Sequence, residues 1–211
     1  MSVEIDGVNN VIKPDGSAMT IGASGDTITI PSGATITATA ATTTGFYAFA
    51  PMVDRWRVTS SLTTSDAEPV SANLERSDDH GSDSSVAGNA LINAGMTQSS
   101  GVFTFPSTGK YYVEFAANAN STSDERYVGL YIQQTINGGT NWYSMTNSIG
   151  SIEDAHSSGT WVSLYCGSYI DVTNTSNVKV RFNANAETNT VFYGDTARDY
   201  FYMTFTKVGD T

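Results

Sequence analysis

Hydrophobic and polar residues alternate along most of the chain from Gly45 onward, and short Gly, Asn and Ser turns separate the alternating stretches. A period of two is typical of a strand that buries one face. In the clearest predicted strand, 177–187, one face is apolar and the other carries Lys179, Arg181 and polar amides. The pattern contains no convincing helix, and it therefore predicts an all-β domain.

Four predicted strands show this alternation most clearly. Their apolar positions are Val178, Val180, Phe182, Ala184 and Ala186; Tyr111, Val113, Phe115 and Ala117; Val128, Leu130 and Ile132; and Phe201, Met203 and Phe205. Roughly eight to ten strands of this kind fit into the chain, which suits a β-sandwich or jelly roll. We therefore predict one head domain over 45–211.

Residues 1–44 follow a different pattern, in which a short Thr-Ile strand is followed by a Gly/Ser turn. Ile21, Ile28, Ile30 and Ile36 lie on these strands, and Ile21, Ile28 and Ile36 recur at a spacing that suits the rungs of a β-solenoid or an intertwined β-prism. An isolated hairpin is marginally stable in water. We expect this arm to pack against neighbouring chains or to dock on another protein; the alternative is a flexible Thr/Ala-rich linker.

Four segments, taken in order, resemble the tumour-necrosis-factor and complement globular-head superfamily. They are 101–115, with Phe, Pro and Gly before a Tyr-rich strand; 127–132, a strand before the Asn137-Gly138 turn; 164–172, with its Leu, Gly and Val; and the closing aromatic strand 200–205. The resemblance extends from about Phe46 to Val208, although 71–95 match poorly and could be an insertion. It implies a ten-stranded antiparallel jelly-roll sandwich that packs as a tight trimer. Separately, the sequence of the arm between Thr20 and Thr35 resembles a short pattern found in structural proteins of tailed phages.

Several tyrosines occupy strand faces that the predicted core does not use. They are Tyr112, Tyr127, Tyr131, Tyr165, Tyr200 and Tyr202. A soluble monomer rarely exposes so much aromatic surface, and tyrosine is enriched at the centres of protein interfaces. We predict that these six residues line the interface of a homotrimer. The alternative is that long loops of the same chain cover the rings.

Composition and charge narrow the choice of partner. Charged residues make up 15% of the chain, and the formal net charge is -11. So acidic a chain has no positive surface for a phosphate backbone or an anionic bilayer, and no apolar stretch is long enough to span a membrane. We expect neither nucleic acid nor a membrane as a direct partner. If the protein belongs to a shell that encloses nucleic acid, we expect it to lie on the outside of that shell.

The sequence offers little chemistry. His80 lies among the acidic residues of loop 77–85. This loop lacks the ligand spacing of a calcium loop, so a solvated loop is the favoured interpretation. Whether the loop binds calcium stays an open question. There is no Gly-x-Ser-x-Gly nucleophile motif. Cys166 is alone, which excludes a disulfide within the chain, and we expect it to be a buried, inert thiol. We predict no enzyme activity, no catalytic residue, no cofactor and no metal site.

Three tryptophans could form a platform on which a sugar stacks. Trp142, beside Tyr143 and the Asn137-Gly138 turn, is expected on an exposed loop and is the candidate for contact with a ligand. Trp56 and Trp161 are expected to pack in the core or at an interface. A loop-borne aromatic pair of this kind could contact a glycan or a host receptor.

These observations predict a virion structural protein on the outer surface of the particle. The leading hypothesis is a trimeric capsid decoration, or cement, protein that contacts the major capsid protein or another virion protein through its arm. The alternative is the receptor- or glycan-binding head of a phage tail fibre or spike.

Overall fold

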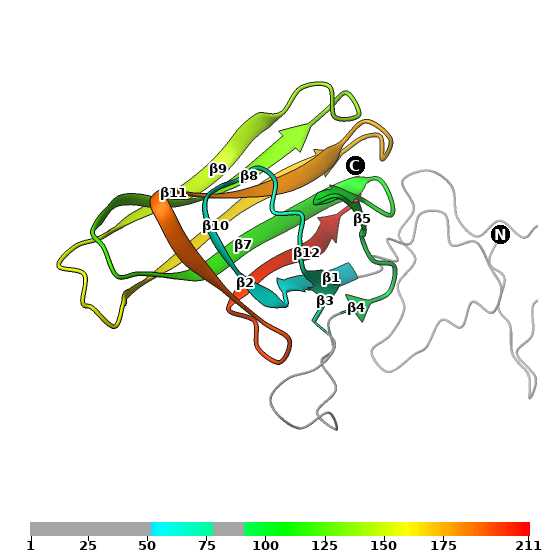
Figure 1. The fold of residues 1–211 in the computed structure, drawn as a ribbon. Helices are drawn as coiled ribbons and strands as arrows, with labels where there is room; N and C mark the ends of the chain where they lie inside the picture. Colours follow the sequence, from blue (N-terminus) through cyan, green and yellow to red (C-terminus); the bar gives the residue numbers. More distant parts are fainter. Residues whose placement is uncertain (1–51, 78–90) are drawn as a thin grey trace, which may run out of the picture. The chain divides into compact units, whose positions relative to one another are not determined.

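The computed structural model describes residues 52–77 and 91–211, and within these residues every regular element is a β-strand (Figure 1). No helix in this part of the chain is long and apolar enough to cross a membrane. The strands are β1 (Met52–Val58), β2 (Ser60–Ala67), β3 (Leu74–Arg76), β4 (Leu91–Ile92), β5 (Thr97–Ser99), β6 (Val102–Thr104), β7 (Gly109–Ser121), β8 (Glu125–Thr135), β9 (Tyr143–Ile152), β10 (Thr160–Val172), β11 (Lys179–Asp195) and β12 (Phe201–Gly209).

Two antiparallel layers form a sandwich, as the alternating pattern predicts. Sheet I has the strand order β3–β1–β12–β7–β10, and β4 also pairs with β1. Sheet II has the order β9–β8–β11–β6–β5, and β2 also pairs with β11. The predicted all-β antiparallel sandwich is therefore confirmed.

β11 belongs to both layers (Figure 1). Its first part, from Lys179 to Ala186, pairs with β8 in sheet II. The register with β2 then shifts between Asn185 and Thr190, and Val191 pairs with Asn120 of β7 in sheet I. A register irregularity of this kind bends a strand and increases its twist, so β11 closes one side of the sandwich.

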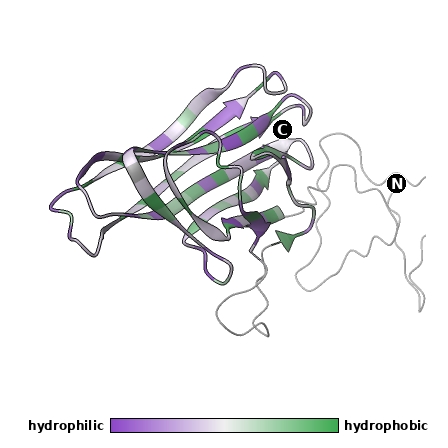
Figure 2. Cartoon of the chain, viewed as in Figure 1, coloured by the Kyte–Doolittle hydropathy of each residue, from purple (hydrophilic) through white to green (hydrophobic). Residues whose placement is uncertain are grey.

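The core lies between the two layers and is rich in phenylalanine. Phe182 of β11 lies with its ring centroid 5.0 Å from that of Phe115 and 5.7 Å from that of Phe205, both in sheet I, and 5.5 Å from that of Phe103 on β6. All the apolar positions of the four clearest predicted strands are buried. Bands of opposite hydropathy follow one another along the strands (Figure 2), as expected when successive side chains point to opposite faces.

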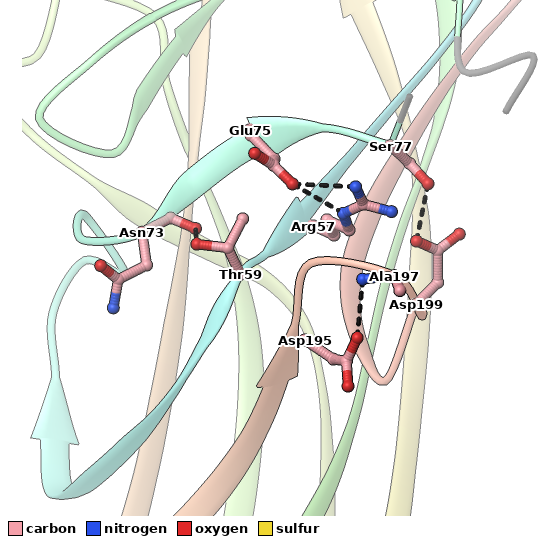
Figure 3. A network of polar contacts seen from close by, with 8 residues as sticks. All are labelled: Arg57, Thr59, Asn73, Glu75, Ser77, Asp195, Ala197 and Asp199. Carbon is pink, nitrogen blue, oxygen red and sulfur yellow. Dashed lines mark hydrogen bonds and ion pairs between the residues drawn. The ribbon is translucent and has the colours of Figure 1, made fainter. Parts of the chain in front are cut away.

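Polar contacts fix one end of sheet I (Figure 3). The buried Arg57 guanidinium on β1 donates from Nε and Nη2 to Glu75 Oε1 on β3, at 3.0 and 2.8 Å. Ser77 Oγ, just after β3, donates to Asp199 Oδ1 in the loop before β12, at 2.7 Å. These contacts hold the short β3 and the loop that leads into β12 beside β1.

The strand count differs from the resemblance-based expectation of ten. The described residues contain twelve strands, and β3 to β6 have only two or three residues each. Strands that short do not produce a visible alternation. The predicted boundary near 45, the arm with Ile21, Ile28, Ile30 and Ile36, and the acidic residues around His80 lie outside the described residues, so those predictions stay open.

Candidate functional site

The outward-facing side of sheet I carries several aromatic side chains, which we call the aromatic face. Its members come from β7, β10, β11 and β12 and are Tyr112, Trp161, Tyr165, Tyr169, Tyr193 and Tyr202. Three of them are strongly exposed, with 71% of Tyr169, 54% of Trp161 and 50% of Tyr165 accessible to solvent. Exposed apolar surface of this extent typically marks an interaction site.

A chain of hydroxyl groups orders the centre of the aromatic face. Tyr165 Oη donates to Glu114 Oε1 at 2.7 Å. Because the single hydroxyl proton of Tyr165 is used in this bond, the 3.1 Å contact between the two tyrosine oxygens has Tyr112 as its donor. The ring of Tyr112 also lies 4.9 Å, centroid to centroid, from that of Tyr169. The central rings are therefore held in place before any partner arrives.

These hydrogen bonds change the acidity of Tyr165. The bond to Glu114, then the bond to Tyr112, then partial desolvation raise the pKa of Tyr165 above its usual value of 10. Each of these effects favours the neutral phenol over the phenolate. Tyr165 thus remains a hydrogen-bond donor throughout the neutral pH range.

Gly167 on β10 allows the ring of Tyr112 to lie across the neighbouring strand. A Cβ atom at this position would lie 2.4 Å from Tyr112 Oη and 2.8 Å from Tyr112 Cζ. Any larger residue would therefore push the ring away from Tyr165. The glycine is required here by the close approach of an aromatic ring.

The border of the aromatic face is more polar than its centre. On one side the guanidinium carbon of Arg55 lies 4.8 Å from the centroid of the Tyr202 ring. The same side chain donates from Nε to Thr204 Oγ1 at 3.1 Å and pairs with Asp199 at 3.3 Å. An aromatic centre with a polar rim is the usual arrangement of a protein–protein interface.

The structure divides the six tyrosines predicted for the interface. Tyr112, Tyr165 and Tyr202 lie on the aromatic face, whereas Tyr127 and Tyr131 lie on the outward side of β8, in the other layer. Tyr200 precedes β12, is half-buried, and accepts a backbone hydrogen bond from Asn118 N at 2.9 Å. A single surface therefore brings together three of the six.

Sequence reasoning missed three members of the aromatic face. Tyr169 has the same parity as Tyr165 on β10, so the alternation contained the signal for it. For Trp161 the sequence did not distinguish a place in the core from a place at an interface. Its side chain is exposed, with its ring 4.3 Å from that of Tyr193. Tyr193 lies in the part of β11 beyond the predicted end at 187, so no pattern pointed to it. Trp56, in contrast, is buried in the core.

A second feature is a hollow of about 400 Å³ on the outward side of sheet II. Trp142 forms part of its wall, with residues of β5, β6 and β11. The predicted partner Tyr143 is 53% exposed but does not line the hollow. The structure therefore separates the predicted aromatic pair and gives only Trp142 a place in a concave site.

Other reactive groups do not gather into a site within the described ranges. No cluster of three or more His, Cys, Asp or Glu residues in these ranges could hold a metal ion. Burial raises the pKa of the Cys166 thiol to about 12, which keeps it protonated and unreactive at neutral pH. His156 lies exposed in the turn before β10, where Nδ1 accepts a hydrogen bond from the Ser158 amide at 3.1 Å.

Comparison with known proteins shows the fold. No family model matches the chain and no curated protein matches it. Among solved structures, the chain is similar to Eiger TNF from S. frugiperda, with a TM-score of 0.54 and 10% identity over 76% of this chain and 95% of that chain. It is also similar to murine APRIL at pH 5.0, with a TM-score of 0.51 and 10% identity over 75% of this chain and 99% of that chain.

The described head has a TNF-like fold. A second structure of murine APRIL, at pH 8.5, agrees with a TM-score of 0.51, 11% identity, and coverage of 75% of this chain and 99% of that chain. Likeness at this level of identity concerns the fold alone. The resemblance noted in the sequence is thus confirmed for the architecture of the head, and its function is argued from the surfaces of the head.

Proposed function

We propose that the TNF-like head forms a homotrimer through its aromatic face and that this trimer is a structural protein on the outer surface of a virion. The aromatic face is the observation that carries the proposal. Three of its rings are exposed in the single chain, and its centre is ordered by hydrogen bonds and a ring contact. A surface that is both apolar and preorganised loses little entropy when it binds.

The aromatic face offers a large apolar area for association. Tyr165, Tyr169 and Trp161 are each at least half exposed. A fully buried aromatic side chain removes about 150–250 Å² of surface, and apolar burial contributes roughly 25 cal/mol per Å². Even partial burial of these rings would yield a few kcal/mol for each chain before ordering costs. The choice of three copies follows from the family resemblance of the sequence.

The virion role draws its support from the charge of the chain and from the arm. A net charge of -11 suits the outside of a shell that encloses nucleic acid. The arm, 1–44, carries the Thr-Ile-Gly pattern that resembles tailed-phage structural proteins. Under this proposal the arm docks on the major capsid protein and the head is presented outward, so that the trimer acts as a capsid decoration protein.

A binding experiment with purified shells tests this role. The full chain and a truncated chain of residues 45–211 are mixed with undecorated capsids and sedimented. The full chain should co-sediment in a saturable manner, and the truncated chain should remain in the supernatant. Equal binding of both chains would rule out docking by the arm, and no binding of either chain would rule out the decoration role.

The second candidate is a receptor- or glycan-binding head on a tail fibre or spike. The hollow beside Trp142 is the specific observation in its favour, because a decoration role makes no use of a concave site. Labelling of intact particles with an antibody against the head distinguishes the candidates. Label over the capsid supports decoration, and label confined to the tail supports ligand binding.

A further inference from the structure

We propose that the hollow beside Trp142 binds an anionic saccharide ring, with Lys179 facing its acidic group and Trp142 facing its apolar side. This inference rests on the ligand-binding candidate described above and names the class of ligand. It does not depend on the decoration role.

Strand pairing places the polar residues of the hollow in a row. Thr97 of β5 pairs with Thr104 of β6, and Thr104 pairs with Lys179 of β11. Paired residues in an antiparallel sheet point to the same side, so the two hydroxyls and the ammonium group share the outward side of sheet II. Ser99 and Gln98 also line the hollow. These groups can donate to and accept from the hydroxyls of a sugar.

The turn that borders the hollow is rigid. Thr135 Oγ1 donates to Asn137 Oδ1 at 2.9 Å and accepts from the Gly139 amide at 3.0 Å. Asn137 Oδ1 also accepts from the Asn141 amide at 3.0 Å. The backbone leading to Trp142 is thus fixed by side-chain contacts. A hollow of about 400 Å³ with a fixed wall fits the usual size range of small-ligand sites.

The charge of the hollow is unusual for this chain. Among the residues that the structure describes, no Asp or Glu lines it, although the chain has 21 acidic and only 10 basic residues. Most basic side chains of the described residues pair with a carboxylate, namely Arg55, Arg57, Arg76, Arg126 and Lys207. Lys179 and Arg181 form no ion pair with the described carboxylates. Lys179 lines the hollow, and a lining cation that has no carboxylate partner among the described residues favours an anionic ligand.

Arg181 does not line the hollow, but it orders the wall that Trp142 forms. Its guanidinium carbon lies 4.6 Å from the centroid of the Trp142 ring, and its Nε donates to Gln133 Oε1 at 2.7 Å. The guanidinium therefore stacks on the indole and holds it against the sheet. Trp142 lines the hollow, and its indole offers an aromatic, apolar surface there. The C–H bonds on one side of a pyranose ring are attracted to such a surface, whereas a simple inorganic anion gains nothing from it.

The site is compatible with the proposed trimer. The hollow is on the outward side of sheet II, and the aromatic face is on the outward side of sheet I. The two surfaces belong to opposite layers of the sandwich. A trimer formed through sheet I leaves the hollow open to solvent, so each chain would bind a ligand independently.

Calorimetric titration of the full chain tests the ligand class. The probes are glucuronate and N-acetylneuraminate, with glucose as the neutral control and acetate as the control for a plain anion. We expect the acidic sugars to bind at least tenfold more tightly than glucose or acetate, and we expect their affinity to fall as salt is added.

Three variants locate the site. Lys179→Gln should weaken binding of the acidic sugars by about tenfold or more, because it removes a charge-assisted hydrogen bond. Trp142→Ala should weaken it by a similar factor. Arg198→Gln removes the same charge from an exposed loop residue that lies outside the hollow, and it should bind as the unmodified chain does. Circular dichroism spectra of all three variants should match that of the unmodified chain.

The outcomes separate this inference from the candidate on which it rests. Equal binding of glucose and the acidic sugars, lost in Trp142→Ala but kept in Lys179→Gln, would overturn the anionic class and leave ligand binding intact. If acetate bound as tightly as the acidic sugars, the claim that the ligand is a saccharide would be overturned. If no probe binds and a glycan array is also negative, both the inference and the ligand-binding candidate fail.

Discussion

At the scale of single residues, the properties of the aromatic face depend on one carboxylate. Glu114 accepts a hydrogen bond from the Tyr165 hydroxyl, and this fixes the direction of the hydroxyl chain from Tyr112 through Tyr165 to Glu114. A carboxylate on an otherwise aromatic surface would be costly to bury without a donor. The bond from Tyr165 removes much of that cost, so the centre of the face can be covered by another chain.

Tyr165 should lose its proton only in strongly alkaline solution. Its pKa is raised above 10, first by the hydrogen bond to Glu114, so the folded state favours the phenol. The resulting contribution to stability is complete below pH 10 and is lost as the pH rises through the raised pKa. Ultraviolet titration of the unmodified chain and of Tyr165→Phe gives the curve of this residue by difference. A midpoint at or below pH 10 would contradict the hydrogen-bond chain.

Cys166 should be unreactive in the folded protein. It is buried, and desolvation raises its pKa to about 12, so almost no thiolate exists at pH 8. A thiol-specific disulfide reagent should give no colour with the native protein within minutes and one equivalent of thiol in denaturant. Rapid reaction of the native protein would show that β10 does not bury this side chain.

Residue parity was the strongest predictor available in the sequence. It placed Val178, Phe115 and Leu130 in the core, and all are buried. It failed at Asn183, which lies on the outward side of β11 but is fully buried, because no local pattern shows what covers a strand face. The hollow could not be predicted from the sequence for the same reason. Its residues Thr97, Trp142 and Lys179 are distant in sequence and meet only in the folded chain.

At the scale of secondary-structure elements, β11 determines how the two layers join. The strand is 17 residues long and contributes to both sheets. The alternation predicted its first part, and it predicted an end at 187. The register shift between Asn185 and Thr190 breaks the period of two, so the sequence reads as a strand end where the strand bends into the other layer.

Phe182→Ala should destabilise the head strongly. The Phe182 ring packs against Phe103, Phe115 and Phe205 and links β11 to sheet I. Replacement of a buried Phe by Ala typically costs about 3–5 kcal/mol of unfolding free energy. Urea denaturation measures this cost, and Phe182→Leu serves as a milder control. A loss below about 1 kcal/mol for the alanine variant would show that the core is packed differently.

Gly167→Ala should disturb the aromatic face without unfolding the sandwich. The new methyl group would meet the Tyr112 ring and push it away from Tyr165, which weakens association of the chains. Gly209→Ala is the matched control, because nothing lies within 4 Å of a Cβ at that position. In sedimentation velocity runs at decreasing protein concentration, Gly167→Ala should dissociate at a higher concentration than the unmodified chain, and Gly209→Ala should not. Identical behaviour of the two variants would remove Tyr112 from the interface.

At the scale of the whole molecule, the described head has two surfaces with different properties. The aromatic face on sheet I is apolar and preorganised, and the hollow on sheet II is polar and cationic. Both lie on a sandwich with a TNF-like fold. Because these surfaces lie on opposite layers, one layer can hold identical chains together while the other remains free for a ligand.

The division of the tyrosines between two layers provides a matched pair of variants. Tyr169 belongs to the aromatic face, and Tyr127 is an exposed tyrosine on the opposite layer. Tyr169→Asp places a charge where the account predicts a buried contact, and an unpaired buried charge opposes association strongly. Tyr127→Asp makes the same chemical change on a surface that a contact through sheet I leaves exposed.

Sedimentation equilibrium of these three proteins is the most direct test of the proposed assembly. We expect three times the mass of one chain for the unmodified protein and for Tyr127→Asp, and the mass of a single chain for Tyr169→Asp. An unmodified protein with the mass of one chain, or a Tyr169→Asp variant that keeps the full mass of the trimer, would contradict the claim that identical chains cover the aromatic face.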